Sequence, residues 1–570
     1  MPSKTTNQSN YRYIFVSGGV MSSLGKGIVA ASVATLLKQA GFKVVPIKFE
    51  NYLNVDAGTI NPIEHGDPFL CADGTEADMD LGSYERFLQQ PVGKDNFVTM
   101  GRIYYEVINK ERQFGYKGED VEAIPHIVEH IIHKIHTALS AQNGQIAVIE
   151  LGGTVGEYQN VLYYEANRLL KFRYPNQVIH IHVSYIPIPP HVGEPKTKPA
   201  QLSVKFLNSM GIQPDFLIAR SPVALDNRRR QRLAMFCNVY PDHIINSPDV
   251  KYVYELPLIF AKQNLHTKIL KQLHLKNTSI DLSHWKKLNQ HINKAQKNPK
   301  AILNIGIVGK YFQTGKFHLA DAYAALIEAI RHAQWAKNYK VNLHFISSPD
   351  LEKLNFQQLH QRLGQLDGII VPIGWGKRGA EGKITAIQFA RQNKIPFLGL
   401  CYGMQLAVVE FARHVAHLDN ADTTENQPDT PHPVIHLIPK QKRLLEKRAY
   451  GGTMRLGEWL CKLKPNTLVT HIYQTYHGEF VDPRKLIISE RHRHRYEFND
   501  QYADILTQHG LIISGRSVEE GLVEMIELPR KLHPFFIATQ GHPEYKSNPF
   551  KPHPLFLAFL DAVYRYHHHY

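Results

Sequence analysis

The chain has 570 residues, of which 43% are hydrophobic and 21% are charged. This length exceeds what one hydrophobic core supports and predicts about two to four domains in an ordinary soluble protein. No run of eighteen apolar residues is present, and the first ten residues lack an apolar signal core, so we expect a cytoplasmic protein with no membrane partner.

The chain is basic, with 66 Lys and Arg against 51 Asp and Glu and a net charge of +15. Such an excess suits nucleic acid, triphosphate substrates or simply a solvated surface. Since no RNP, zinc-finger or helix-turn-helix signature accompanies it, we do not expect nucleic-acid binding. The four cysteines, at positions 71, 237, 401 and 461, have no paired spacing and support neither a disulfide framework nor a CxxC metal site.

Strand-like apolar runs alternate with helix-length segments in the first half. Residues 13–17 lead into a glycine-rich turn and a helical stretch at 28–39, and residues 43–48 and 146–151 are typical of buried parallel strands. This alternation predicts an α/β fold with a mainly parallel, doubly wound sheet.

The same alternation begins again after a polar, lysine-rich stretch at residues 275–300. Further strands are predicted at 302–309, 368–372 and 396–400. We therefore expect two doubly wound α/β domains, at residues 1–287 and 301–570, joined by a linker at 288–300.

A glycine-rich loop at residues 17–27, SGGVMSSLGKG, follows the first strand and opens the first helix. Glycines let backbone N–H groups turn toward an anion, the helix N-terminus adds positive potential, and Lys26 supplies a cation. The spacing differs from the standard Walker pattern, and a tight turn is the alternative. That alternative leaves Lys26 unexplained, so a phosphate site is favoured.

A magnesium–nucleotide site also needs oxygen ligands. Asp78 and Asp80 lie in the segment EADMDLG, and Glu150 ends a buried strand. A carboxylate at a strand end faces the edge where open α/β sheets bind ligands, whereas Asp78 could equally be a helix cap.

The second half carries a different chemistry. Cys401 follows a strand in LGLCYGMQ, an arrangement that exposes a nucleophile and aims the next helix N-terminus at it. His542 and Glu544, in QGHPE, are candidates for the base and the residue that orients it. A core cysteine and a loop histidine are the alternatives, and finding both patterns in order makes them less attractive.

Taken together, several segments of the first half resemble the synthase domain of CTP synthases over about residues 11–285. They occur in the order SGGVMSSLGKG, KFENYLNVDAGTINPIEHGDPF, TEADMDLGSYERF, MGRIYYEV, IELGGTVGE, GEPKTKP and MFCNV. The resemblance implies magnesium ligands at Asp80 and Glu150 and a catalytic lysine at Lys48 beside Lys26. The implied ATP-binding residues are Ser23, Leu24, Gly25, Lys26, Gly27, Ile28 and Asp80. The implied UTP-binding residues are Ser22, Lys196, Thr197, Lys198, Pro199, Ala200, Gln201 and Arg232.

The second half resembles the class I glutamine amidotransferase domain fused to these enzymes, and the segments GGTMRLG and ERHRHRYE are further matches. The resemblance implies that Cys401 attacks glutamine, that His542 moves protons and that Glu544 orients His542. The implied glutamine-binding residues are Gly374, Tyr402, Gly403, Met404, Gln405, Glu425 and Arg495.

The activity implied is the amination of UTP to CTP through a 4-phosphorylated intermediate, with ATP, Mg²⁺ and ammonia from glutamine. The family also implies a homotetramer and GTP as an allosteric activator. Two alternatives stay open: a related enzyme that uses another pyrimidine nucleotide or mainly free ammonia, and a structural paralogue with little catalysis. A structural paralogue should lack some of the catalytic residues, whereas all of them are present in this sequence.

Some positions depart from the family pattern. The usual Gly-Gly-Phe-Gly is replaced by Ile373-Gly374-Trp375-Gly376, and a lysine usual in the UTP pocket is Arg232. CLGMQ is CYGMQ, and FHPEF is GHPEY. In the product-feedback region, where the family commonly has Asp-x-Glu after GGTVG, this chain has Glu157, Tyr158 and Gln159, and this change predicts altered inhibition by CTP. At Ile373, a β-branched residue would resist a positive φ, which predicts a strained or flipped peptide and slow glutamine hydrolysis.

Overall fold

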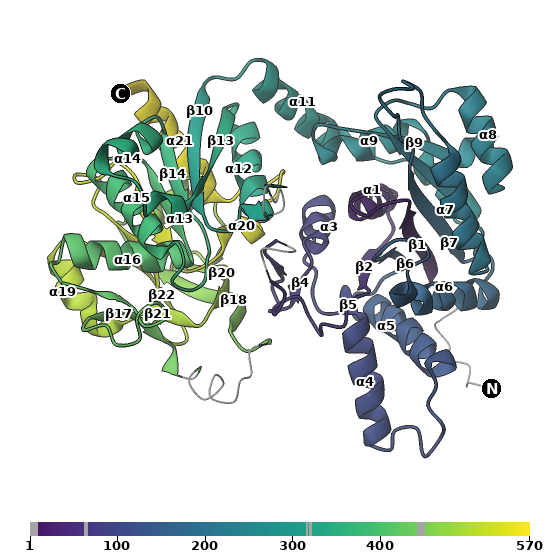
Figure 1. Cartoon of the computed structure of the whole chain (residues 1–570), viewed down its shortest axis with the longest axis horizontal. Coiled ribbons are helices and arrows are strands. Elements are labelled where there is room, and N and C mark those ends of the chain that lie inside the picture. Colours follow the sequence, from purple (N-terminus) through teal and green to yellow (C-terminus); the bar gives the residue numbers. More distant parts are fainter. Residues whose placement is uncertain are drawn as a thin grey trace. The chain divides into compact units, whose positions relative to one another are not determined.

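The computed structural model describes residues 10–61, 66–314, 317–318, 322–439, 441 and 451–569. Contacts divide the chain into two units, one made of residues 1–57 and 80–289 and the other of residues 58–79 and 290–570. Each unit is a mixed α/β structure (Figure 1). No helix in the described part of the chain is long and apolar enough to cross a membrane.

The first unit is built on a seven-stranded sheet in the order β5-β2-β6-β1-β7-β8-β9, with every pair parallel. Its strands are β1 (Arg12–Gly19), β2 (Val44–Glu50), β5 (Phe97–Thr99), β6 (Ile146–Leu151), β7 (Val178–Tyr185), β8 (Phe216–Ser221) and β9 (Ile244–Pro248). Strands β2 and β6 are buried at every position, as expected of parallel strands covered on both faces. The predicted strand at 146–151 is confirmed.

Helices follow most of these strands along the chain. They are α1 (Lys26–Gln39), α3 (Asp80–Leu88), α4 (Met100–Arg112), α5 (Val128–Ala141), α6 (Val161–Arg173), α7 (Lys198–Ser209), α8 (Asn227–Cys237), α9 (Leu256–Lys262), α10 (Leu265–Gln272) and α11 (Ser283–Lys297). Helix α1 is buried along almost its whole length because it is rich in Ala, Val and Leu. Its rigid packing fixes the loop that precedes it.

The second unit has a ten-stranded sheet in the order β13-β10-β14-β15-β24-β23-β22-β18-β20-β19. The first five strands are parallel: β10 (Ile302–Gly309), β13 (Lys340–Ser347), β14 (Gly368–Val371), β15 (Phe397–Leu400) and β24 (Phe536–Thr539). The others pair antiparallel: β18 (Arg455–Leu463), β19 (Phe480–Asp482), β20 (Ile487–His494), β22 (Ile512–Ser517) and β23 (Val523–Glu527). The strand predicted at 302–309 is confirmed, but the sequence did not indicate the antiparallel half.

The helices of this unit pack two hydrophobic clusters against the sheet. They are α12 (Ala324–Lys337), α13 (Ser348–Leu351), α14 (Phe356–Leu363), α15 (Ala380–Gln392), α16 (Tyr402–His414), α18 (Leu468–Thr475), α19 (Ala503–Gln508), α20 (Pro543–Lys546) and α21 (Pro554–His569). A small sheet of β16 (Asp422–Thr423), β17 (Pro433–Leu437) and β21 (Tyr496–Phe498) follows α16.

A short segment from early in the chain belongs to the second unit. Residues 58–79 contain the hairpin of β3 (Phe69–Leu70) and β4 (Glu76–Ala77), whose buried Glu76 accepts a hydrogen bond of 2.6 Å from Arg493 Nε. Arg491 also donates to the Leu70 carbonyl oxygen at 2.9 Å. Polarity and periodicity along residues 58–79 carry no signal of this pairing.

Candidate active site

The glycine-rich loop between β1 and α1 is shaped by close approaches. Gly25 has a φ of +78°, which an L side chain adopts poorly. A Cβ on Gly19 would lie 1.7 Å from the hydroxyl oxygen of Ser203, and one on Gly27 would lie 2.2 Å from Asp80 Oδ1. Glycine at these positions therefore lets α7 and the carboxylate of Asp80 lie directly against the loop.

Lys26, the first residue of α1, is buried and donates from Nζ to the Gly153 carbonyl oxygen at 2.7 Å. Burial, and then the neighbouring Lys48, lower the pKa of Lys26, while Glu150 and other carboxylates partly offset this. A lysine in such a setting gains from an anionic partner, which is what a nucleotide phosphate supplies.

Lys48, on β2, is surrounded by three carboxylates. Its Nζ lies 2.6 Å from Asp80 Oδ2, 2.7 Å from Glu150 Oε1 and 3.1 Å from Glu50 Oε1. The structure thus brings the predicted residues Lys48, Asp80 and Glu150 together, and adds Glu50, which the sequence analysis missed. Glu50 ends β2 just as Glu150 nearly ends the adjacent β6, so the strand-end argument would also have found it.

The acidic side chains fit a hard divalent cation. Glu50 and Asp80 offer carboxylate oxygens within 4.8 Å of each other, which suits Mg²⁺. Glu150 is more deeply buried, and its second oxygen accepts a hydrogen bond from Tyr84. Burial, with Asp80, raises the pKa of Glu150, and Lys48 opposes this. A bound cation would lower the free-energy cost of burying the ionised carboxylate of Glu150.

The segment predicted to bind UTP forms the start of α7. Lys196 and Thr197 precede this helix, and residues 198–201 form its first turn, where Gln201 donates from Nε2 to Thr197 Oγ1 at 3.1 Å. Ser22 is exposed in the glycine-rich loop. Arg232 lies exposed on α8 with its guanidinium 5.8 Å from the centre of the Phe236 ring, and no contact in the described part of the chain ties it to α7.

A buried polar network joins the loop strand to α7. Ser17 Oγ lies 2.8 Å from His182 Nδ1, and His182 Nε2 lies 2.6 Å from Ser203 Oγ. All three side chains are buried, and burial lowers the pKa of His182 to about 3, so the ring is neutral. The sequence analysis missed this network, because a histidine within an apolar strand carries no signal of its partners.

The predicted feedback segment is only partly available to a ligand. Glu157 accepts hydrogen bonds from the Thr154 backbone N–H at 2.7 Å and from Asn51 Nδ2 at 2.8 Å. Tyr158, in contrast, is 97% exposed, and Gln159 is exposed. Glu157 therefore closes its own loop, while its two neighbours face solvent.

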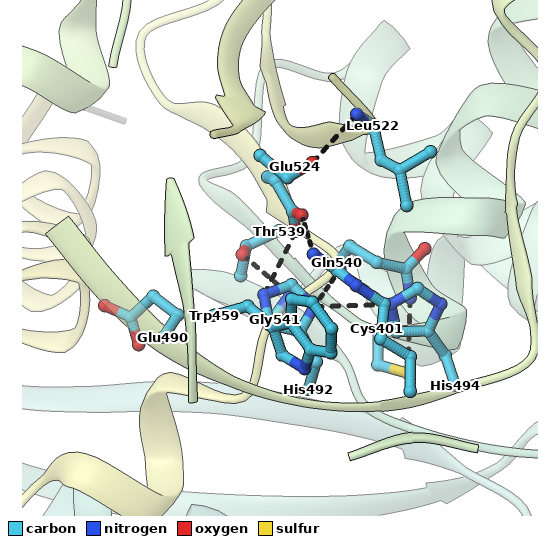
Figure 2. Close-up of polar contacts among 12 residues, drawn as sticks. Cys401, Trp459, Glu490, His492, His494, Leu522, Glu524, Thr539, Gln540 and Gly541 are labelled. Atoms are coloured by element: carbon cyan, nitrogen blue, oxygen red, sulfur yellow. Dashed lines mark hydrogen bonds and ion pairs between the residues drawn. The ribbon is translucent and has the colours of Figure 1, made fainter. Parts of the chain in front are cut away.

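Cys401 sits at a sharp turn between β15 and α16. Its φ of +52° and ψ of −103° are unusual for a residue with a side chain, and such strain is typical of a nucleophile at a strand–helix junction. The thiol is buried, with Gln540 Nε2 at 3.5 Å from Sγ and the Arg493 carbonyl oxygen at 3.7 Å (Figure 2). Tyr402, the first residue of α16, has a backbone N–H with no acceptor in its own helix.

His542 and Glu544 are paired near this cysteine. His542 Nδ1 lies 2.7 Å from Glu544 Oε1, and no group in the described residues hydrogen-bonds its buried Nε2. Burial lowers the pKa of His542, but Glu544 and Cys401 outweigh burial and raise it to about 10. The ring stacks on Tyr545 at a centroid distance of 5.2 Å, and Tyr545 donates to the Pro68 carbonyl oxygen at 3.1 Å. Glu544 therefore favours the protonated form of the histidine, and the contacts on both sides fix its orientation.

The residues predicted to bind glutamine lie around the same turn. Glu425 Oε1 accepts from the Gly376 backbone N–H at 2.7 Å, and burial raises the pKa of Glu425. Gln405 donates from Nε2 to the Tyr496 carbonyl oxygen at 2.9 Å, and Arg495 donates to Gln441 Oε1 at 2.6 Å. Gly403 and Met404 are buried in the first turn of α16.

A second buried cluster contains Glu524, His492 and His494, which are labelled together with Cys401 in Figure 2. Glu524 binds Arg455 at 2.8 Å and His492 at 3.0 Å, and His492 Nδ1 lies 3.3 Å from His494 Nε2. Burial raises the pKa of Glu524 to about 7, against the effect of Arg455. The Glu524 carbonyl oxygen accepts from the Gln540 backbone N–H at 2.8 Å, so the strand of this cluster holds the residue that directly follows β24.

Three charged residues near Cys401 were missed by the sequence analysis. Lys310 donates from Nζ to the carbonyl oxygens of Gly376 at 2.8 Å and Arg378 at 3.2 Å. Lys383 is fully buried, and the carboxylate of Asp67 has a buried Oδ1 with no hydrogen-bond partner in the described part of the chain. Burial raises the pKa of Asp67, which Arg493 and His542 partly counter. Asp67 lies in the segment 58–79, which the sequence alone does not assign to the second unit.

Ile373 does not have the strained backbone that the sequence analysis expected. It is absent from the residues with positive φ, and its side chain is buried in a hydrophobic cluster. Its carbonyl oxygen accepts from Lys383 Nζ at 3.2 Å and from the Tyr323 hydroxyl at 3.3 Å. Because a negative φ is open to isoleucine, the proposed source of strain is absent.

Comparisons with known proteins agree with both halves. Residues 12–275 match the family described as CTP synthase N-terminus, and residues 318–562 match glutamine amidotransferase class-I. A CTP synthase of Caldanaerobacter subterraneus is 46% identical over 97% of this chain and 98% of its own length. One of Carboxydothermus hydrogenoformans is 47% identical over the same shares.

Among solved structures, the glutaminase domain of Trypanosoma brucei CTPS with bound acivicin is 32% identical. It covers 46% of this chain and 94% of that one, with a TM-score of 0.41. The near full-length similarity to the curated relatives decides the family: the chain belongs to the CTP synthases.

Proposed function

We propose that this chain converts UTP to CTP, using ATP to activate the pyrimidine and glutamine as the source of ammonia. The observation that carries the proposal is the presence in one chain of two complete constellations. One is the set of Lys26, Lys48 and buried carboxylates beside the glycine-rich loop, and the other is Cys401 with the His542–Glu544 pair.

In the first constellation, oxygen O4 of the uracil ring attacks the γ-phosphorus of ATP, and ADP leaves. Ammonia then adds to C4, the C4–O bond breaks, and phosphate departs. Phosphoryl transfer mainly requires positioning and neutralisation of charge. Lys26 and Lys48 supply cations, and Asp80, Glu150 and Glu50 would hold Mg²⁺, which would supply further positive charge to neutralise the phosphates.

The residues at the start of α7 would receive UTP. Lys196 and Lys198 are cations suited to a triphosphate, and Ser22 and residues 23–28 of the glycine-rich loop would hold the phosphates of UTP and ATP, respectively. Arg232 would need to contribute from the exposed face of α8. The buried Ser17–His182–Ser203 network supports the position of α7 against the loop.

In the second constellation, the Cys401 thiol gives its proton to His542, and the thiolate sulfur attacks the amide carbon of glutamine to form a tetrahedral intermediate. His542 gives a proton to the departing ammonia, and a thioester remains. Water then attacks the thioester carbon and loses a proton to His542, and glutamate leaves as the C–S bond breaks. Glu544 holds the imidazole in orientation throughout, because it binds Nδ1 and leaves Nε2 facing the reaction.

The family membership further supports Mg²⁺ as the metal, GTP as an activator, a homotetramer as the assembly and the cytoplasm as the location.

The deciding experiment is a product assay with purified protein, UTP, ATP and Mg²⁺, and either glutamine or ammonium chloride. We expect CTP from both nitrogen sources, with ADP and phosphate formed in equal amounts. Replacing UTP with dUTP or TTP tests the alternative substrates. No CTP from ammonium would overturn the proposed synthase activity, while CTP from ammonium alone would limit the chain to an ammonia-dependent enzyme.

A further inference from the structure

Lys383, on α15, is a buried lysine whose role is not accounted for by the proposed chemistry. Its side chain is 0% exposed, and its Nζ donates to the carbonyl oxygen of Pro372 at 2.7 Å and to that of Ile373 at 3.2 Å. It also lies 5.3 Å from the centre of the Tyr402 ring. Burying an amine costs desolvation free energy, so its position here must be stabilised by the hydrogen bonds that it donates.

The two carbonyl oxygens belong to the loop that follows β14 and carries Gly374. In a trans peptide, the N–H points opposite to the preceding carbonyl. Lys383 and the Tyr323 hydroxyl both hold the Ile373 carbonyl oxygen, so the Gly374 N–H is directed away from them. Among the residues that the structure describes, no backbone carbonyl oxygen accepts a hydrogen bond from this N–H.

Gly374 is also close to the residue that follows the nucleophile. A Cβ on Gly374 would lie 3.3 Å from Tyr402 Cδ1 and 3.0 Å from Lys383 Nζ. Gly374 therefore packs against the side chain of Tyr402, whose own backbone N–H directly follows Cys401 in the chain. A pair of backbone N–H groups is what stabilises the negative oxygen of a tetrahedral intermediate.

We propose that Lys383 is a positioning residue that fixes the Pro372 and Ile373 carbonyl oxygens and thereby keeps the Gly374 N–H directed into the oxyanion hole. This inference rests on the proposed glutaminase function. Lys383 does not touch the substrate, and it acts only through the backbone of the loop. The interaction requires N–H donors, which both the charged and the neutral amine supply.

An orientation role has a distinct kinetic signature. The oxyanion forms only in the transition state and the intermediate, so a misdirected N–H lowers kcat while KM for glutamine changes little. Removing one oxyanion donor outright costs about 10²–10³-fold in rate, so partial loss of orientation should cost at least about 10-fold. An aldehyde analogue of glutamine, which forms a tetrahedral adduct on the cysteine, should lose affinity in the same proportion.

The test is Lys383→Met, which keeps the length of the side chain but removes the donors, compared with Lys353→Met, which removes an exposed lysine of the same unit. Glutamine hydrolysis, inhibition by the aldehyde analogue and CTP formation from ammonium are measured for each. We expect a fall of at least about 10-fold in kcat, a change in KM of less than about 3-fold, weaker inhibition in parallel, and retained synthesis from ammonium.

Tyr323→Phe provides a second test that leaves Lys383 in place, because it removes the other donor to the Ile373 carbonyl oxygen. We expect a smaller fall in kcat in the same direction. Unchanged kcat in both variants, or a loss that appears mainly in KM, overturns the inference. If the unmodified protein hydrolyses no glutamine, the proposed function itself fails; hydrolysis that is insensitive to both substitutions defeats only the role of Lys383.

Discussion

Nδ1 of His542 lies 2.7 Å from Oε1 of Glu544, and this pair explains how a fully buried imidazole keeps a proton. Burial alone would lower the pKa of the ring, as it does for the buried His182, where no carboxylate is paired with it. At His542, the carboxylate and the thiol together raise the pKa to about 10.

The first prediction concerns Glu544→Gln. Without the carboxylate, the pKa of His542 falls below about 10, so the ring loses its proton at lower pH. The protonated imidazole, which is the acid that protonates the leaving ammonia, is then depleted at a lower pH. The alkaline fall of kcat/KM for glutamine should therefore move to lower pH. We also expect a rate loss of about 10²-fold or more at neutral pH. A pH–rate profile from pH 6 to pH 10 measures both effects, and an alkaline limb that stays in place contradicts the role of Glu544.

The second prediction separates the two nitrogen sources. Cys401→Ala removes the nucleophile, so glutamine-dependent synthesis should fall by at least about 10³-fold. Synthesis from ammonium should remain, because free ammonia replaces the product of the step that needs the Cys401 thiol. Cys461→Ala, a change at another buried cysteine of the same unit, is the matched control for packing effects. Equal loss from both sources in Cys401→Ala would point to a different role for this residue.

The third prediction places Lys26 in a step that both nitrogen sources share. Its Nζ is held 2.7 Å from the Gly153 carbonyl oxygen beside the glycine-rich loop, where the phosphates of ATP would lie. Lys26→Ala should reduce CTP formation by at least about 10²-fold with glutamine and with ammonium alike. The exposed Lys205 on α7 provides a control, since Lys205→Ala removes the same charge elsewhere in the unit. Synthesis near the unmodified rate in Lys26→Ala would remove ATP activation from this residue.

The fourth prediction concerns the metal. Asp80→Asn and Glu150→Gln each replace a charged oxygen ligand with a neutral amide, which a hard cation binds more weakly. We expect the Mg²⁺ concentration for half-maximal synthesis to rise about 10-fold or more, with basal glutamine hydrolysis less affected. A Mg²⁺ titration of CTP formation measures this, with Asp242→Asn, an exposed carboxylate, as the control. An unshifted titration in both variants would rule out the proposed ligands.

Much of the fold could be predicted because each strand of the parallel sheets is a short apolar run next to a helix. Strand β6 and strand β10 lie where the sequence placed them. The antiparallel half of the second sheet could not be predicted, because β20 is buried at every position after Ile487 although most of these residues are polar. Charged residues of β18 and β20 are held there by internal ion pairs. Their partners lie far away in the sequence.

The candidate sites were predictable to the extent that local motifs carry them. Lys48, Asp80 and Glu150 do meet, and His542 is paired with Glu544. The residues that support these groups were not predictable. Asp67 lies in the segment 58–79, which belongs to the second unit although it comes early in the sequence. Lys383 has no local sequence signal, because its role depends on hydrogen bonds to two loop carbonyl oxygens that only the fold brings near.

The last prediction concerns Ile373, for which the sequence suggested that glycine would improve glutamine hydrolysis. The structure removes the reason for that gain, because Ile373 has no positive φ and its carbonyl oxygen is already fixed by Lys383 and Tyr323. Its side chain is 3% exposed and packs in the core of the second unit, so Ile373→Gly would open a cavity and loosen the loop.

We therefore expect Ile373→Gly to hydrolyse glutamine more slowly than the unmodified protein, with a lower thermal midpoint. Ile373→Val, which removes one methylene group and keeps the branched Cβ, should retain most of the activity. Glutamine hydrolysis and thermal unfolding of the three proteins decide the matter. Faster hydrolysis in the glycine variant would show that isoleucine does restrain the peptide, and that the hydrogen bonds from Lys383 and Tyr323 hold the loop in a poorly active form.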